Sequence, residues 1–166
     1  MKNFSTRALA RGAMIAALYA VLTLLLQPLS FGAIQFRFSE ALTVMPMLAA
    51  DAVPGLAVGC LLANLLGGAP WFDVLFGTLA TLLAALATRR LRSNPTLATA
   101  MPVLFNGLIV GPVVYFAYEL APGAAVEMGA LWTTVATVAL GEAVVCMLLG
   151  RLLYAALEKA PEKLWK

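Results

Sequence analysis

The chain has 166 residues, of which 63% are hydrophobic and only 11% are charged, and its formal net charge at pH 7 is +3. A soluble domain carries about 25% charged residues and could not bury this much apolar surface. The composition therefore excludes a soluble protein and predicts an all-α integral membrane protein whose residues 1–166 form a single helical domain.

Side chains that usually carry catalysis are scarce. The chain has no histidine, so the commonest general base and metal ligand is missing. Cys60 and Cys146 lie in apolar runs, and their separation fits neither a CxxC metal site nor a disulfide framework. We interpret both as small core residues and expect no metal, no cofactor and no enzymatic centre.

The first predicted helix spans about 8–26, which is long enough to cross a bilayer, and Pro28 follows it. Small residues recur every four positions along this helix, at Ala8, Gly12, Ala16 and Ala20. Such a stripe lets another helix approach closely in lipid. Two interpretations remain open: the stripe packs inside this protein, or it is the docking face for a separate membrane subunit.

A dense polar stretch, IQFRFSEAL, follows at 34–42. Arg37 and Glu40 are three residues apart, so a helical turn would place them on one side. Such groups are costly between membrane segments unless they pair with each other or with a ligand. The simpler alternative is an interfacial ion pair that anchors the chain.

Five further helices are predicted, and the first of them begins within this stretch. Two short ones are expected at about 38–50, with Ser39 as N-cap and Pro46 at a kink, and at about 54–66. Each is shorter than the about 20 residues of a straight crossing, so the two could form a single bent crossing. Longer helices are expected at about 71–88, 96–118 and 130–157.

The positive charges decide between five and six crossings. With six transmembrane helices, both termini lie on one side, together with every one of the 11 Lys and Arg residues except Arg37. With five crossings, the basic cluster at 89–92 would lie opposite the basic N-terminus. Basic residues concentrate on the cytoplasmic side, so we predict six helices with cytoplasmic N- and C-termini.

This topology gathers polar side chains toward the outer half of the bundle. Glu142 is about 15 Å from the outer end of its helix, so it should face the interior and have a partner. That partner could be structural, such as Thr, Asn or Arg37, or it could be a ligand. The candidate substrate-binding residues are Gln35, Phe36, Arg37, Glu40, Asn64, Trp71, Asp73, Asn106, Tyr115 and Glu142.

Three motifs carry a resemblance to a known family. The stretch at 34–42, the run GCLLANL at 59–65 and the run DVLFGTLAT at 73–81 resemble the QueT family, over nearly the full length of the chain. That family consists of substrate-binding S components of energy-coupling-factor (ECF) transporters, which import a queuosine precursor. The first helix is similar to the family's AxxxA docking pattern, with Gly12 in place of one alanine.

The resemblance implies a multi-pass protein of a prokaryotic cell membrane that binds preQ1, 7-aminomethyl-7-deazaguanine. It also implies three partners, a transmembrane coupling subunit and two cytoplasmic ATPases, and the chain itself has no nucleotide-binding loop. No nucleic-acid partner is implied. The guanine-like edge of a deazaguanine can pair with a carboxylate, and the depth of Glu142 favours that residue for the role. The ring of the ligand suits stacking on Trp71 or Tyr115.

Other functions remain open at the level of sequence. The chain could be an S component for another vitamin or purine-like compound, although the acidic residues favour a cationic ligand over an anionic one. It could also be a membrane scaffold without a ligand. A scaffold would not need both Glu40 and Glu142, and a membrane enzyme would normally show a nucleophile with its base.

Overall fold

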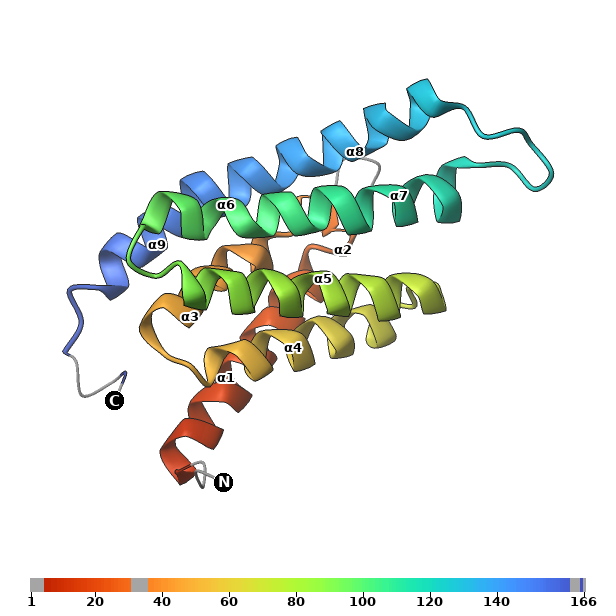
Figure 1. The fold of residues 1–166 in the computed structure, drawn as a ribbon. Coiled ribbons are helices and arrows are strands. Elements are labelled where there is room, and N and C mark those ends of the chain that lie inside the picture. The colour runs from red at the N-terminus through yellow and green to blue at the C-terminus, as the bar shows by residue number, and fades with distance from the viewer. Residues whose placement is uncertain (1–4, 31–35, 162–164, 166) are drawn as a thin grey trace.

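The computed structural model describes residues 5–30, 36–161 and 165, and the regular structure of these ranges is helical. The longer helices form a bundle, in which the start of α1 (Thr6–Leu25) and the end of α9 (Gly150–Leu157) lie at the same end (Figure 1). The extended loop before α8 (Met128–Glu142) lies at the opposite end (Figure 1). Polar groups on different helices can therefore meet only in the bundle interior or at one of its ends.

The remaining elements fall between these helices in chain order. They are α2 (Gln27–Ser30), η1 (Phe38–Val44), α3 (Met45–Leu48), α4 (Ala52–Leu66), α5 (Trp71–Arg90), α6 (Pro95–Phe105), η2 (Asn106–Val110), α7 (Gly111–Val114), η3 (Tyr115–Glu119) and η4 (Ala143–Leu149). The element η1 is a 3-10 helix, whereas η2, η3 and η4 are wide π-helical turns inside longer helices.

Within the described residues, four helices are long and apolar enough to cross a membrane: Thr6–Leu25, Trp71–Arg90, Pro95–Glu119 and Met128–Leu157. Two shorter apolar helices, Phe38–Leu48 and Ala52–Leu66, occupy the places of the second and third predicted crossings. The predicted helical positions are thus reproduced within a few residues. The protein is a multi-pass membrane protein, because several separate helices meet the length and hydropathy of a span.

Local sequence explains most of the helix ends. Ser5 caps α1 by accepting a hydrogen bond from the Ala8 N–H, and Asn94 caps α6 in the same way through Leu97. Gly68, with φ of +73°, makes the turn that ends α4. The wide turn η2 ends two residues before Pro112, which has no N–H and whose ring does not fit a regular helical ladder.

The prediction that Ser39 is an N-cap is wrong. Arg37 occupies the cap position of η1 without a capping hydrogen bond, and Ser39 lies buried inside the helix. Its hydroxyl pairs with that of Thr23 on α1, 2.7 Å away. A neighbouring helix therefore satisfies the group that sequence reasoning had assigned to the backbone.

Small residues bring α1 and α4 into close contact. A Cβ atom added to Gly55 would lie 2.6 Å from the carbonyl oxygen of Gly12, and one added to Gly59 would lie 2.9 Å from that of Ala16. Ala16 and Ala20 are both buried. Within the predicted small-residue stripe, Gly12 and Ala16 therefore pack against α4 inside this protein.

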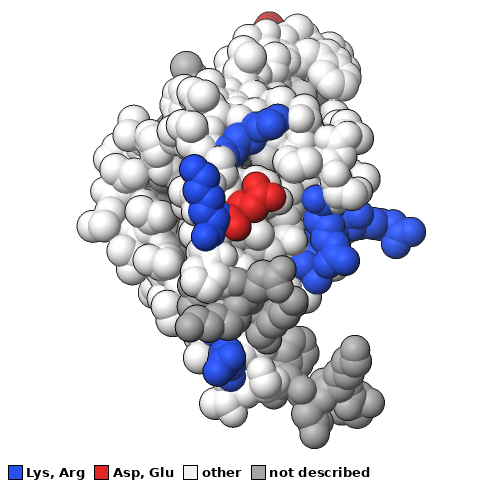
Figure 2. Space-filling model, turned by 90° about the vertical axis from the view of Figure 1, so that its left-hand side faces the viewer, with Lys and Arg blue, Asp and Glu red and all other residues white. Residues whose placement is uncertain are grey.

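Basic side chains gather at the end of the bundle where α1 begins. Figure 2 shows this end, with Lys and Arg side chains around a small acidic patch. The basic residues come from the first turns of α1, from the last turn of α5 and from the region of α9. They include Arg7, Arg11, Arg89, Arg90, Arg151 and Lys159. Arg11 forms a two-bond ion pair with Asp51, at 2.6 Å for each bond.

Candidate functional site

Arg37 and Glu40 of the polar stretch are buried in the bundle. Arg37 is 3% exposed and Glu40 is fully buried, so the interpretation of these two residues as interfacial anchors is wrong. The Arg37 Nη2 atom lies 3.5 Å from Oδ2 of Asp73 on α5, and its Nε donates to the Ser30 carbonyl at 3.4 Å. Arg37 thus ties the start of η1 to both α2 and α5.

Gly77 provides room beside this ion pair. A Cβ atom at Gly77 would lie 3.1 Å from Asn64 Nδ2, 3.1 Å from Asp73 Oδ1 and 3.8 Å from Arg37 Nη1. Asn64 also donates to the backbone carbonyl of Asp73 at 3.2 Å. The structure therefore brings together three predicted site residues, from the N-terminal end of η1, from α4 and from α5.

Glu40 is held by two donors on other helices. Its Oε1 atom accepts a hydrogen bond from the Tyr19 hydroxyl of α1 and another from Thr81 Oγ1 of α5, at 3.2 Å. Thr81 also donates to Cys60 at 3.3 Å, and Asn64 contacts Cys60 at 3.6 Å. Hydrogen bonds through Cys60 and Thr81 therefore link Asn64 to Glu40.

Glu142 faces the interior, as its depth in the sequence predicted, and is 1% exposed. Its Oε2 atom accepts from the Cys146 thiol at 3.3 Å, and the same sulfur lies 3.6 Å from the Glu40 carbonyl oxygen. One carboxylate oxygen of Glu40, one of Glu142 and Sγ of Cys146 all lie within 4.8 Å of one another. The two glutamates are therefore neighbours, although they are 102 positions apart in the chain.

The interior polar network consists of Arg37, Glu40, Asn64, Asp73, Asn106 and Glu142, with Tyr19, Thr81, Cys60 and Cys146 as its supporting residues. Three of its buried acceptor atoms have no hydrogen-bond partner within the described ranges: Glu40 Oε2, Asn64 Oδ1 and Asp73 Oδ1. Leaving such atoms unpaired in an apolar surrounding costs about 1 to 3 kcal/mol each. Their number in one network makes it the candidate functional site of this protein.

The predicted aromatic residues are divided between different surroundings. Trp71 is 70% exposed, contacts Phe72 with ring centroids 5.0 Å apart, and lines an apolar surface groove of about 610 Å³. Tyr115 is buried, and its hydroxyl accepts a hydrogen bond from the Glu127 N–H at 2.9 Å. Phe36 is half-buried, and Gln35 lies outside the described residues. The structure does not bring Trp71 into the interior polar network.

Sequence reasoning missed Tyr19, Thr81 and Cys146. Tyr19 had a detectable signal, because a buried tyrosine on an apolar membrane helix needs a partner for its hydroxyl. Cys146 is four residues after Glu142, a spacing that places the two side chains on one helix face. A metal ion could fit by distance between the carboxylate oxygens of Glu40 and Glu142 and the sulfur of Cys146. The Cys146 thiol, however, lies in hydrogen-bond contact with the Glu142 carboxylate.

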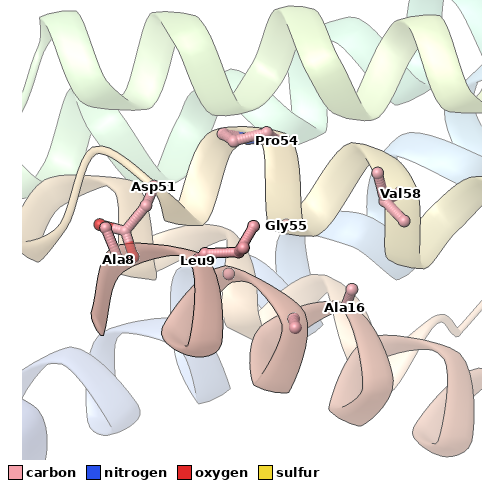
Figure 3. A pocket seen from close by; sticks show the side chains of 9 residues that line it. Ala8, Leu9, Ala16, Asp51, Pro54, Gly55 and Val58 are labelled. Atoms are coloured by element: carbon pink, nitrogen blue, oxygen red, sulfur yellow. The ribbon is translucent and has the colours of Figure 1, made fainter. Parts of the chain in front are cut away.

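A second feature lies on the surface between α1 and α4. It is a groove of about 340 Å³ that contains part of the small-residue stripe (Figure 3). Its lining residues are Ala8, Leu9, Gly12, Ala13, Ala16, Asp51, Pro54, Gly55 and Val58. Ala20 does not line it, so the predicted docking residues are divided between this groove and the interior.

Comparison with known proteins places the chain among membrane transporters. The family model described as QueT transporter matches residues 9–159, which is most of the chain. The chain belongs to the QueT transporter family. The family resemblance seen in the sequence motifs is thereby confirmed.

The chain is also similar to the queuosine precursor transporter QueT of Lactococcus lactis subsp. cremoris (strain MG1363). It is 37% identical to this chain over 84 residues. The aligned part covers 49% of this chain and 49% of the relative, so the similarity spans about half of each protein. No solved structure matches the chain significantly.

Proposed function

We propose that this chain is the substrate-binding S component of an ECF importer and that it binds preQ1 from outside the cell. The observation that carries the proposal is the interior polar network, in which buried polar atoms without partners lie inside an apolar membrane bundle. Family membership and the name of the Lactococcus relative support a queuosine precursor as the ligand.

The chemistry of the network suits a deazaguanine. The guanine-like edge presents N1–H and an exocyclic amine as adjacent donors, and a carboxylate or an amide oxygen can accept both. Asp73 Oδ1 and Asn64 Oδ1 are buried acceptors without partners among the described residues, and both side chains adjoin Gly77. We assign the guanine-like edge to this pair. Aromatic stacking falls to Tyr115 or Phe36, since Trp71 is directed to the surface.

The proposed orientation places the basic end of the bundle in the cytoplasm (Figure 2). Positive residues favour the cytoplasmic side of a membrane, and α5 ends there with Arg89 and Arg90. In this arrangement the six helical segments are six crossings, and both termini are cytoplasmic. The substrate enters from the other end, where the loop before α8 lies.

Energy for uptake would come from other polypeptides. The chain has no nucleotide-binding motif, so we assign ATP hydrolysis to two cytoplasmic ATPases and force transmission to a transmembrane coupling subunit. The docking surface that fits this role is the groove between α1 and α4, where Ala8 and Gly12 line an exposed apolar hollow. Ala16 and Ala20 contribute through packing inside the protein.

Equilibrium binding of preQ1 to the purified chain tests the proposal. We expect saturable binding of one ligand per chain, with guanine weaker and with riboflavin, thiamine and biotin not competing. Reconstitution with a coupling subunit and ATPases should then give ATP-dependent uptake. Tighter binding of another vitamin or purine would replace preQ1 as the ligand, and failure to bind any of these compounds would contradict the role as an S component.

A further inference from the structure

We propose that Glu40 and Glu142 together bind the ammonium group of the substrate and so select a cationic deazaguanine over a neutral one. The inference rests on the proposed function, because it names the part of that site which reads the ligand's charge. It changes the role assigned to Glu142, whose depth in its predicted helix had favoured binding of the guanine-like edge.

The distance between the two carboxylates fits an ammonium ion. One oxygen from each side chain lies within 4.8 Å of the other, and both residues are at most 1% exposed. Hydrogen bonds from an ammonium to a carboxylate are about 2.8 Å long, so one nitrogen can reach two oxygens that are up to about 5.6 Å apart. A single ammonium placed between η1 and the end of α8 can therefore bind both residues.

The charges of the buried groups favour such a cation. Apart from Asp51, which pairs with Arg11, the buried acids among the described residues are Glu40, Asp73 and Glu142, and the buried base is Arg37. One guanidinium can offset one of these three negative charges at most. Two like charges within 4.8 Å also repel each other in an apolar interior. A bound cation removes that repulsion, and a shared proton is the competing explanation.

Unpaired polar atoms point to a ligand at the same place. Tyr19 and Thr81 both donate to Oε1 of Glu40, whereas the buried Oε2 of Glu40 has no partner in the described structure. Asn106 is 3% exposed, and its side chain adjoins both carboxylates. An ammonium supplies three donors, so it can bind a carboxylate oxygen of Glu40 and one of Glu142 at once.

A metal ion fits these groups less well. The Cys146 thiol lies in hydrogen-bond contact with Glu142 and with the Glu40 carbonyl, which uses its proton. Metal binding would need the thiolate, and this would add a further negative charge to a buried site that already holds an excess of acid. Asp73 is a weaker candidate for the ammonium, since it already faces Arg37 and the Tyr118 hydroxyl, each at 3.5 Å.

The test compares ligands that differ in charge. Dissociation constants of the purified chain are measured for preQ1, for the neutral nitrile 7-cyano-7-deazaguanine and for N-acetylated preQ1. We expect preQ1 to bind at least about tenfold more tightly than either neutral compound. In Glu142→Gln this preference should fall close to one. Glu119→Gln is the matched control, because it makes the same change at an exposed residue and should keep the preference.

The outcomes separate this inference from the proposed function. If preQ1 does not bind, the proposed function fails. If preQ1 and the neutral compounds bind equally well to the wild-type chain, the function stands and the ammonium site is overturned, which leaves a shared proton between the glutamates. Binding that is lost in EDTA and restored by Zn²⁺ would assign the pair to a metal instead. The wild-type comparison remains decisive even if Glu142→Gln does not fold.

Discussion

The Tyr19 hydroxyl of α1 donates a hydrogen bond to the Glu40 carboxylate of η1, and both side chains are fully buried. Tyr19 lies one turn after Ala16, so the helix that lines the surface groove also holds a glutamate of the interior polar network. A shift of α1 would therefore disturb Glu40 directly. This contact is a physical link between the proposed docking groove and the proposed ligand site.

Replacing Tyr19 by Phe removes this hydrogen bond and keeps the buried ring. We expect weaker preQ1 binding, by about tenfold, because a hydrogen bond to a charged group contributes about 1.5 to 3 kcal/mol and positions Glu40. Titration of the purified variant with preQ1 measures the change. Tyr154→Phe is the control, since Tyr154 bonds Glu158 at an exposed site. Wild-type affinity in Tyr19→Phe would contradict a role for this contact.

Asp73→Asn leaves the buried Arg37 guanidinium without the carboxylate it faces. Breaking one side of a buried ion pair costs about 3 to 5 kcal/mol, so we expect a strong loss of folded protein. Adding Arg37→Gln should recover part of the stability, because neither buried charge then remains. Thermal unfolding in detergent measures both variants.

Asp51→Asn is the matched comparison for this prediction. It breaks the Arg11 pair, whose side chains are 15% and 7% exposed, and should cost less than Asp73→Asn because the Arg11–Asp51 pair is less buried than the Arg37–Asp73 pair. Equal losses in Asp51→Asn and Asp73→Asn would show that burial of the Arg37–Asp73 pair does not matter for stability.

Gly55→Ala tests the close approach of α1 and α4. The new Cβ would lie 2.6 Å from the Gly12 carbonyl oxygen, which is backbone and cannot rotate away. We expect a destabilisation of about 1 to 3 kcal/mol, measured as a lower unfolding temperature. Gly129→Ala is the control, because nothing lies within 4 Å of its added Cβ. An unchanged unfolding temperature in Gly55→Ala would show that the helices can separate without cost.

Ala13→Leu tests the groove as a docking surface. Ala13 is exposed and lines the groove, so the larger side chain should obstruct a partner helix without entering the core. Co-purification with the coupling subunit and ATP-dependent uptake should fall, whereas preQ1 binding by the isolated chain should stay unchanged. Ala17→Leu, on the same helix but outside the groove lining, should leave all three intact.

The same substitution at Ala16 or Ala20 would test something else. Both residues are buried, so leucine there should lower the stability of the isolated chain as well as its assembly. Normal assembly of Ala13→Leu would remove the groove from the proposal and leave the stripe with its internal packing role alone.

The sequence by itself determined the all-helical class and the positions of the helices. A composition of 63% hydrophobic residues cannot be satisfied outside a bilayer, and prolines, glycines and basic clusters mark the helix ends. It also identified Glu142 as an interior residue, because a carboxylate far from both helix ends is too costly to face lipid. These features depend on local composition and spacing, which a single chain displays directly.

Only the tertiary structure decided which polar groups meet. Arg37 and Glu40 are close in sequence, but the structure shows Arg37 facing Asp73 and Glu40 held by Tyr19 and Thr81. Likewise, the small-residue stripe could have faced a partner or the interior, and Gly55 and Gly59 of α4 engaged Gly12 and Ala16. Periodicity gives the face of a helix, whereas the rotation of that face toward a particular neighbour depends on side chains distant in the chain.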